Sequence, residues 1–204
     1  MVSQPGGYRN LSDGRHRAAA VFLLLSAAMF TDTEVLAPPP AAAGEGWQVI
    51  AADSDTGHWH AHARSLLFYW RNRCHDGRLP ARDMINPADL RGILPYMWML
   101  DIQPEPWRFL YRLAGTRFVA ALGLEVTRRW YDEARPLAWA ANRNRLITVA
   151  RDALPTWRRG RMPLETGDWR EVENLMLPLA ADGRHPDIIL GISIPYRSDG
   201  RLAV

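Results

Sequence analysis

The residues best suited to chemistry in this 204-residue chain are two glutamates, Glu171 and Glu173. They stand two apart in a stretch expected to be a strand, so both side chains can face one side of a sheet. Paired carboxylates perform acid–base hydrolysis when their surroundings separate their pKa values and an opposing surface holds the substrate. We favour a different interpretation, in which Glu173 partners an arginine inside the fold. A small exported enzyme or binding protein that uses this strand stays open as the alternative.

Three histidines at alternate positions, His58, His60 and His62, have a spacing that suits a metal. On a helix, His58 and His62 share one face at i, i+4, as a zinc-binding pair does. Two ligands leave a divalent ion under-coordinated. We therefore expect solvated imidazoles ahead of a core helix, and no metal site.

Cys74 is the only cysteine, so the chain cannot form an internal disulfide, which suits a reducing compartment. Neighbouring arginines at positions 71, 73 and 78 could lower the pKa of its thiol. No other part of a cysteine-enzyme signature is present. We therefore expect an inert thiol near the end of a helix.

The composition excludes several kinds of chemistry. All 25 basic residues are arginine, which excludes lysine Schiff bases and the phosphate loop that needs a lysine. The isoelectric point of about 9.4 accompanies a net charge of only +3, and arginines and acids are interspersed. Such a mixed field does not form a basic stripe, so we expect no nucleic-acid partner.

The first 46 residues are expected to lie outside the packed domain. Arginines precede an apolar run over residues 18–30, which has the outline of a signal peptide and is too short to span a membrane. The alternative, which we favour, is that translation begins at Met29 and the protein is cytoplasmic. Residues 36–46 are rich in proline and alanine and indicate an unpacked linker. Residues 47–204 then form one domain.

The periodicity of that domain predicts an α+β fold with an antiparallel sheet. Alternating apolar residues and turn dipeptides predict strands over residues 96–102, 107–113, 154–162, 169–179 and 188–196. Helical patterns and caps predict helices over residues 58–76, 116–122 and 136–153. If Ile102 pairs with Trp107 in the first hairpin, Asp101 lies opposite Arg108 as a charge pair.

The helix expected over residues 136–153 has the composition of a pocket wall. Trp139 is followed by polar residues at i+3 and i+4, and Leu146 lies one heptad on. A mostly apolar face with a few polar groups is typical of a small-molecule site. Asn142 and Arg143 would favour a small anionic or carbonyl-bearing ligand. The residues expected to form the ligand site are Tyr111, Trp139, Asn142, Arg143 and Leu146.

Several short motifs follow one another in a fixed order between residues 62 and 196. They include Tyr-Trp at 69–70, Leu-Pro-Ala-Arg at 79–82 and Pro-Ala-Asp-Leu at 87–90. Their main residues are Tyr69, Trp70, Pro80, Arg82, Pro95, Asp101, Arg112, Gly115, Glu173 and Pro178. In this order they resemble a bacterial family of stand-alone PAS domains. The resemblance implies a five-stranded antiparallel sheet with helices over one face, preceded by an N-terminal helix.

The resemblance also implies a signalling function without catalysis. The domain would sense a small molecule, or serve as an adaptor through its exposed sheet face. Its expected partners are another signalling protein or a second copy, and we expect a weak homodimer through the helix around Leu67. No Cys-x-x-Cys-His motif occurs, and no histidine lies between Asp76 and Asp182, where haem-binding PAS domains carry a ligand. No cysteine follows Gly115, so the sequence argues against flavin-linked photochemistry as well as haem.

Overall fold

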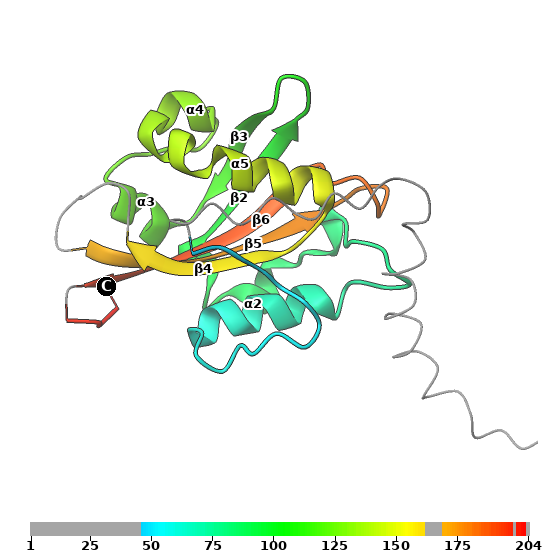
Figure 1. The fold of residues 1–204 in the computed structure, drawn as a ribbon, viewed down its shortest axis with the longest axis horizontal. Coiled ribbons are helices and arrows are strands. Elements are labelled where there is room, and N and C mark those ends of the chain that lie inside the picture. The colour runs from blue at the N-terminus through cyan, green and yellow to red at the C-terminus, as the bar shows by residue number, and fades with distance from the viewer. Residues whose placement is uncertain (1–45, 162–168, 198, 203–204) are drawn as a thin grey trace, which may run out of the picture. The chain divides into compact units, whose positions relative to one another are not determined.

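The computed structural model describes residues 46–161, 169–197 and 199–202, and Figure 1 shows their arrangement. The segment expected to be unpacked, residues 1–46, lies outside the described residues except for Gly46. The helices are α2 (Ala61–Arg71), α3 (Thr116–Leu122), α4 (Tyr131–Ala134) and α5 (Pro136–Asp152). The strands are β1 (Gln48–Val49), β2 (Met97–Gln103), β3 (Arg108–Ala114), β4 (Thr156–Arg161), β5 (Trp169–Leu179) and β6 (Ile188–Arg197). Short 3-10 helices, η1 (Arg82–Met84), η2 (Pro87–Leu90) and η3 (Leu94–Tyr96), join α2 to β2.

In the described part of the chain the strands form one antiparallel sheet in the order β1-β4-β5-β6-β2-β3. Five of them fall where alternation predicted strands, which confirms the α+β fold. The sixth, β1, has two residues, and Gln48 lies opposite Trp157 of β4. A run of two residues is too short for alternation to reveal, so the sequence did not predict it. The ranges of α3 and α5 match their predictions to within one residue.

Helices cover both faces of the sheet (Figure 1). Helices α3, α4 and α5 pack on the face that receives Trp98 and Leu100 of β2. Helix α2 packs on the opposite face, over Met97 and Met99 of the same strand, because successive side chains in a strand point to opposite sides. The central strand β6 is buried along Ile188–Tyr196. The adaptor surface expected on an exposed sheet face is therefore covered along this strand.

Helix α2 is shorter than predicted, and its leucines point inward. It begins at Ala61 because His60 takes an extended backbone and its Nδ1 accepts the N–H of His62 at 3.1 Å. Leu67 is 3% exposed and packs in the core of its own chain, so placing it at a dimer interface was wrong. Phe68, at 68% exposure, is the apolar side chain that α2 presents to solvent. The homodimer itself stays a prediction.

The first hairpin has a different register from the one expected. Ile102 pairs with Phe109, two residues later than predicted, because the turn begins one residue later and ends one residue later. Asp101 accepts a hydrogen bond from Nε of Arg112 at 2.5 Å, a diagonal contact on one face of the hairpin. Arg108, its expected partner, instead pairs with the carboxylates of α4.

Candidate functional site

A cavity of about 50 Å³ lies between the sheet and the layer of α3, α4 and α5. Its apolar walls include Trp47, Trp98, Phe118, Leu146, Val172 and Met176. Its polar lining includes Arg135, Asn142, Arg158, Asn174 and Ser193, with the hydroxyl-bearing rings of Tyr111 and Tyr131. An apolar enclosure with a few convergent polar groups is the usual makeup of a small-molecule site.

A chain of hydrogen bonds joins three strands across one wall of the cavity. Nε1 of Trp98 donates to Oγ of Ser193 at 2.8 Å, and that hydroxyl donates to Oδ1 of Asn174 at 2.7 Å. Because an indole nitrogen only donates, the serine accepts from Trp98 and turns its own proton toward the asparagine. The Trp98 ring lies against Gly191, where a Cβ would come within 2.2 Å of it. The wall is therefore rigidly built, with the amide oxygen of Asn174 turned toward Ser193.

Two tyrosines stack at another wall. The rings of Tyr111 in β3 and Tyr131 in α4 have their centres 5.4 Å apart. Nδ2 of Asn142 lies 3.4 Å from the Tyr131 hydroxyl and donates to the carbonyl of Ala138 at 2.9 Å. Burial raises the pKa of both phenols, and the neighbouring Tyr131 raises that of Tyr111 further, while the charge of Arg135 acts the other way. Both hydroxyls therefore stay neutral and serve as hydrogen-bonding groups.

The indole N–H of Trp47 is buried in the cavity wall without an acceptor among the described residues. Trp47 precedes β1 and is 7% exposed. The guanidinium carbons of Arg158 and Arg145 lie 5.2 and 6.0 Å from its ring centre. A buried donor that lacks an acceptor costs about 1–3 kcal/mol.

The structure brings three of the five expected ligand residues to this cavity. Tyr111, Asn142 and Leu146 line it, whereas Trp139 and Arg143 do not. Each residue turns a helix by about 100°, and the inward line of α5 follows the i, i+4 series through Asn142 and Leu146. Trp139 is partly buried and packs on Phe109 and Tyr131, while Arg143 is exposed to solvent. The placement of Trp139 and Arg143 in the pocket is therefore wrong.

Sequence reasoning missed other polar residues of the cavity. Ser193 interrupts the apolar run of β6, and this interruption is a signal that could have found it, whereas Asn174 follows the charged residues of β5 and gives no such signal. Arg135 stands before the first proline of α5, and Arg158 lies in β4. Trp47 lies far from all of them in sequence, and no local pattern places it in the wall.

Glu173 occupies a separate, fully buried site on the α2 face of the sheet. Its carboxylate accepts hydrogen bonds from the backbone N–H of His60, from Nε1 of Trp157 at 3.0 Å and from the hydroxyl of Tyr196 at 2.9 Å. The prediction that Glu173 partners an arginine is wrong, since its hydrogen bonds within the described part of the chain come from other residues. Arg159, which lies opposite Glu173 in the sheet, instead has its Nε 3.3 Å from the carboxylate of Glu171. Both oxygens of Glu173 are thus held by donors of the protein, which gives this carboxylate a structural role.

The three histidines do not gather around one point. His58 lies outside the helix, against the ring of Trp157 with 5.2 Å between ring centres, so the expected i, i+4 pair with His62 does not form. Among the described residues, histidine, cysteine and acidic side chains form no group of three or more that could hold a metal ion.

Burial raises the pKa of the Cys74 thiol to about 12 although Arg71 lowers it, as expected for an inert thiol.

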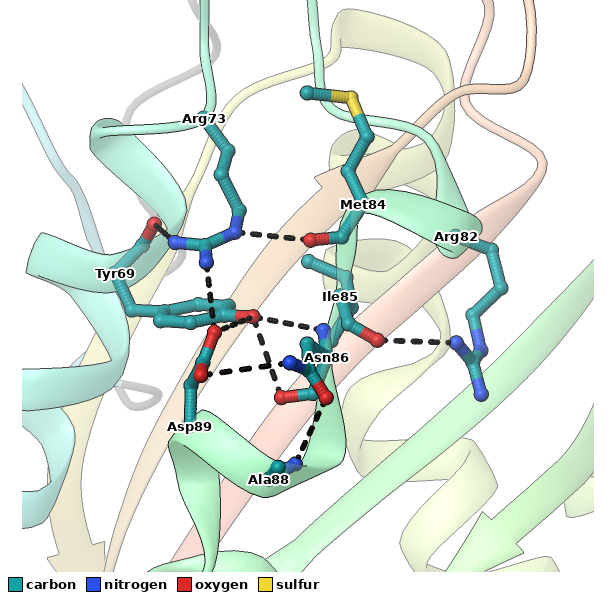
Figure 2. A network of polar contacts seen from close by, with 8 residues as sticks. All are labelled: Tyr69, Arg73, Arg82, Met84, Ile85, Asn86, Ala88 and Asp89. Atoms are coloured by element: carbon teal, nitrogen blue, oxygen red, sulfur yellow. Dashed lines mark hydrogen bonds and ion pairs between the residues drawn. The ribbon is translucent and has the colours of Figure 1, made fainter.

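The first group of shared motifs builds a polar network at the end of α2, shown in Figure 2. The hydroxyl of Tyr69 accepts the N–H of Asn86 at 2.8 Å, and the guanidinium of Arg73 lies 3.4 Å from the centre of the Tyr69 ring. Arg73 also pairs with Asp89 at 3.0 Å, while Arg82 donates to a carbonyl three residues on at 3.3 Å. These contacts fasten α2 to η1 and η2, so the motif has a structural function.

The remaining motifs meet in pairs across the fold. Nε1 of Trp70 donates to the carbonyl of Pro178 at 2.9 Å, and the carbonyl of Pro80 accepts the N–H of the residue after β5 at 3.1 Å. Gly115 lies so close to η3 that a Cβ would come within 2.4 Å of the carbonyl oxygen of Pro95. These contacts therefore join motif residues that are far apart in the sequence.

These observations define an α+β domain with a partly open cavity between the sheet and a helical layer. A model of the PAS domain family matches residues 59–194, and the chain belongs to that family. This confirms the resemblance drawn from the motifs. PAS domains are in general sensory and signalling modules that lack catalytic activity. The comparisons with curated proteins and with solved structures gave no match.

Within the described ranges, every helix is too short or too polar to cross a membrane.

Proposed function

We propose that this domain senses a small molecule bound in the cavity between the sheet and α3–α5. The observation that carries the proposal is Nε1 of Trp47, a buried donor in the cavity wall that lacks an acceptor among the described residues. Buried donors are nearly always satisfied in folded proteins. A bound ligand with a hydrogen-bond acceptor would satisfy this one and would fill a space that the core leaves open.

Helix α5 offers a route from the cavity to the surface. Its inner side places Ala138, Asn142 and Leu146 against the cavity, and its first turn carries Leu137, which is 64% exposed. One side of α5 faces the cavity and the other faces solvent. If a ligand shifts this helix against the sheet, the side chains on its solvent-facing side move with it. A ligand shifts such an equilibrium by its difference in affinity for the two arrangements.

Two substitutions on α5 test the proposal. Ala138→Met fills the cavity from a residue that is 1% exposed, and Ala140→Met places the same side chain on the solvent side of the helix. Native mass spectrometry of the purified protein reports bound small molecules and oligomeric state together. We expect a bound species in the parent and in Ala140→Met, and its loss in Ala138→Met. An empty cavity in all three proteins, with no small molecule able to bind, contradicts the sensing function.

We infer that the output passes to another signalling protein or a second copy of the chain. The exposed side chain of Phe68 supports α2 as the surface for this contact, since apolar groups at solvent-facing positions often mark interaction sites.

The single cysteine supports a reducing compartment such as the cytoplasm, with export as the alternative. The engagement of Glu173 and Glu171 in contacts within the chain supports a function without catalysis.

A further inference from the structure

The cavity offers hydrogen-bond donors and positive charge. We propose that the ligand of this cavity is a short monocarboxylate with about three to five non-hydrogen atoms, a proposal that rests on the sensing function proposed above. The lining residues whose side chains carry donors of this kind are Arg135, Arg158, Trp47 and Asn174, and Nη2 of Arg158 also donates to the carbonyl of Arg161 at 3.3 Å. Among the described residues that line the cavity there is no aspartate and no glutamate. The site therefore suits a group that accepts hydrogen bonds and carries negative charge.

The hydrogen bonds within the wall fix the direction of these donors. Ser193 holds Oδ1 of Asn174 at 2.7 Å, so the Nδ2 end of that amide points away from the serine. Nδ2 of Asn174, a half-buried residue, donates no hydrogen bond within the described part of the chain, and Nε1 of Trp47 is buried there without an acceptor. One donor from β5 and one from the residue before β1 thus lie at the same cavity without an acceptor among the described residues.

The positive charge lies close to these donors. Arg158 stacks over the Trp47 ring at 5.2 Å, and Arg135 lies near enough to the Tyr111 hydroxyl to lower its pKa. A charge inside an enclosure of low polarity interacts more strongly than one in water. Guanidinium groups bind carboxylates through paired, charge-assisted hydrogen bonds, so a carboxylate gains from both the charge and the geometry.

The size and the apolar walls restrict the rest of the ligand. A buried water needs about 10–15 Å³, so a cavity of about 50 Å³ holds roughly three to five water-sized groups. Phe118, Leu146 and Met176 supply apolar surface for a short alkyl chain, which inorganic anions lack. Acetate and propionate have the matching size, whereas a six-carbon carboxylate exceeds it.

Isothermal titration of the whole chain with sodium propionate tests the assignment. Propionamide, a neutral molecule of the same shape, and sodium nitrate, an anion without an alkyl chain, serve as competing probes. We expect propionate to bind and both other probes to bind at least about tenfold more weakly, since a hydrogen bond to a charged group contributes roughly that factor or more. Hexanoate should bind more weakly than propionate for lack of space. Equal binding of propionamide and propionate would overturn the carboxylate assignment.

Variants place the binding in this cavity. Arg135→Gln, Arg158→Gln and Trp47→Phe each remove a donor, and each should weaken propionate binding about tenfold. Arg143→Gln, an exposed arginine on α5, is the matched control and should bind within about twofold of the parent. Thermal melts of each variant separate lost binding from lost folding. If all three cavity variants are folded and bind propionate as the parent does, the site is wrong.

The failure of this inference differs from the failure of the sensing function. If the parent binds a neutral or cationic small molecule and Ala138→Met does not, the sensing function is supported and the carboxylate assignment is contradicted. If the cavity binds no propionate, no propionamide and no co-purified molecule, both the carboxylate assignment and the sensing function are contradicted.

Discussion

Both oxygens of the Glu173 carboxylate in β5 accept the backbone N–H of His60, at 2.9 and 3.1 Å. The two residues are 113 positions apart, and the contact fastens the start of α2 to the centre of the sheet. A negative charge at the N-terminal end of a helix is favourable because the helix dipole places partial positive charge there. The carboxylate thus performs for α2 what a local capping residue usually does.

We expect Glu173→Ala to lower the free energy of unfolding by about 3 kcal/mol or more. The substitution leaves the N–H of His60, the indole of Trp157 and the hydroxyl of Tyr196 without their acceptor, and each buried unpaired donor costs about 1–3 kcal/mol. Urea unfolding followed by circular dichroism measures the change. Glu171→Ala, two residues away in a half-exposed ion pair, should cost less than about 1 kcal/mol. Equal effects of the two substitutions would show that Glu173 is not the anchor.

Gly115→Ala should destabilise the domain by about 1–3 kcal/mol, as expected when an atom is forced into a packed region. The added Cβ would lie 2.3 Å from the carbonyl oxygen of Leu94, and backbone atoms cannot move aside as a flexible side chain does. Gly92→Ala is the control, because a Cβ there meets no atom within 4 Å. Thermal melts compare both with the parent. If Gly115→Ala melts at the parental temperature, the close approach of β3 to η3 is not required.

Stability should fall as the pH drops through the range below about 6.5. Burial lowers the pKa of both His60 and His62, and the charge of His62 lowers that of His60 further. The unfolded chain therefore binds more protons than the folded one between the lowered values and 6.5, and stability in that window rises with pH. Above the window the stabilisation is complete. Protonation of His60 Nδ1 also removes the acceptor that caps α2.

His60→Asn tests the pH dependence, because asparagine keeps a capping acceptor and does not titrate. Its melting temperature should change less than that of the parent between about pH 7.5 and pH 5. His75→Asn, at an exposed position outside the helix cap, should keep the parental slope. If the melting temperature of His60→Asn changes with pH as much as that of the parent, the pH dependence of stability belongs to other groups.

The Cys74 thiol should react slowly in the folded protein. Burial raises its pKa to about 12, so little thiolate is present at neutral pH, and thiolate is the reactive form. We expect alkylation by iodoacetamide at about pH 8 to be at least about tenfold slower than in the chain unfolded by urea. Mass spectrometry of timed samples measures the rate. Equal rates before and after unfolding would contradict the burial of this thiol.

Substitutions at neighbouring residues of α2 separate folding from self-association. Leu67→Arg should unfold the domain, because Leu67 is 3% exposed and an unpaired buried charge is costly. Phe68→Arg should leave the melting temperature close to that of the parent, since this side chain is 68% exposed. If α2 forms the homodimer, sedimentation will show that Phe68→Arg weakens it. If the parent protein stays monomeric at every accessible concentration, the prediction of a homodimer is contradicted.

The sequence alone determined where the longer helices and strands form, but not the two-residue β1 or the four-residue α4. Residues 169–179 and 188–196 matched β5 and β6, and the nearly continuous apolar run of β6 is typical of a strand that is buried on both faces and is visible locally. Pro136 and the helical pattern after it placed α5 for the same reason. The motif residues were recognisable because each maintains a contact that the fold requires, as Trp70 does with Pro178.

Only the tertiary structure decided which side of each element faces the cavity. On α5 a step of one residue turns a side chain by about 100°, which separates buried Asn142 from exposed Arg143. Register decided that Asp101 meets Arg112, because the position of the turn shifts every cross-strand pair at once. Trp47, Arg135 and Arg158 come together from separate parts of the chain. No local pattern encodes such a meeting, since it depends on how β1, β4 and α5 pack.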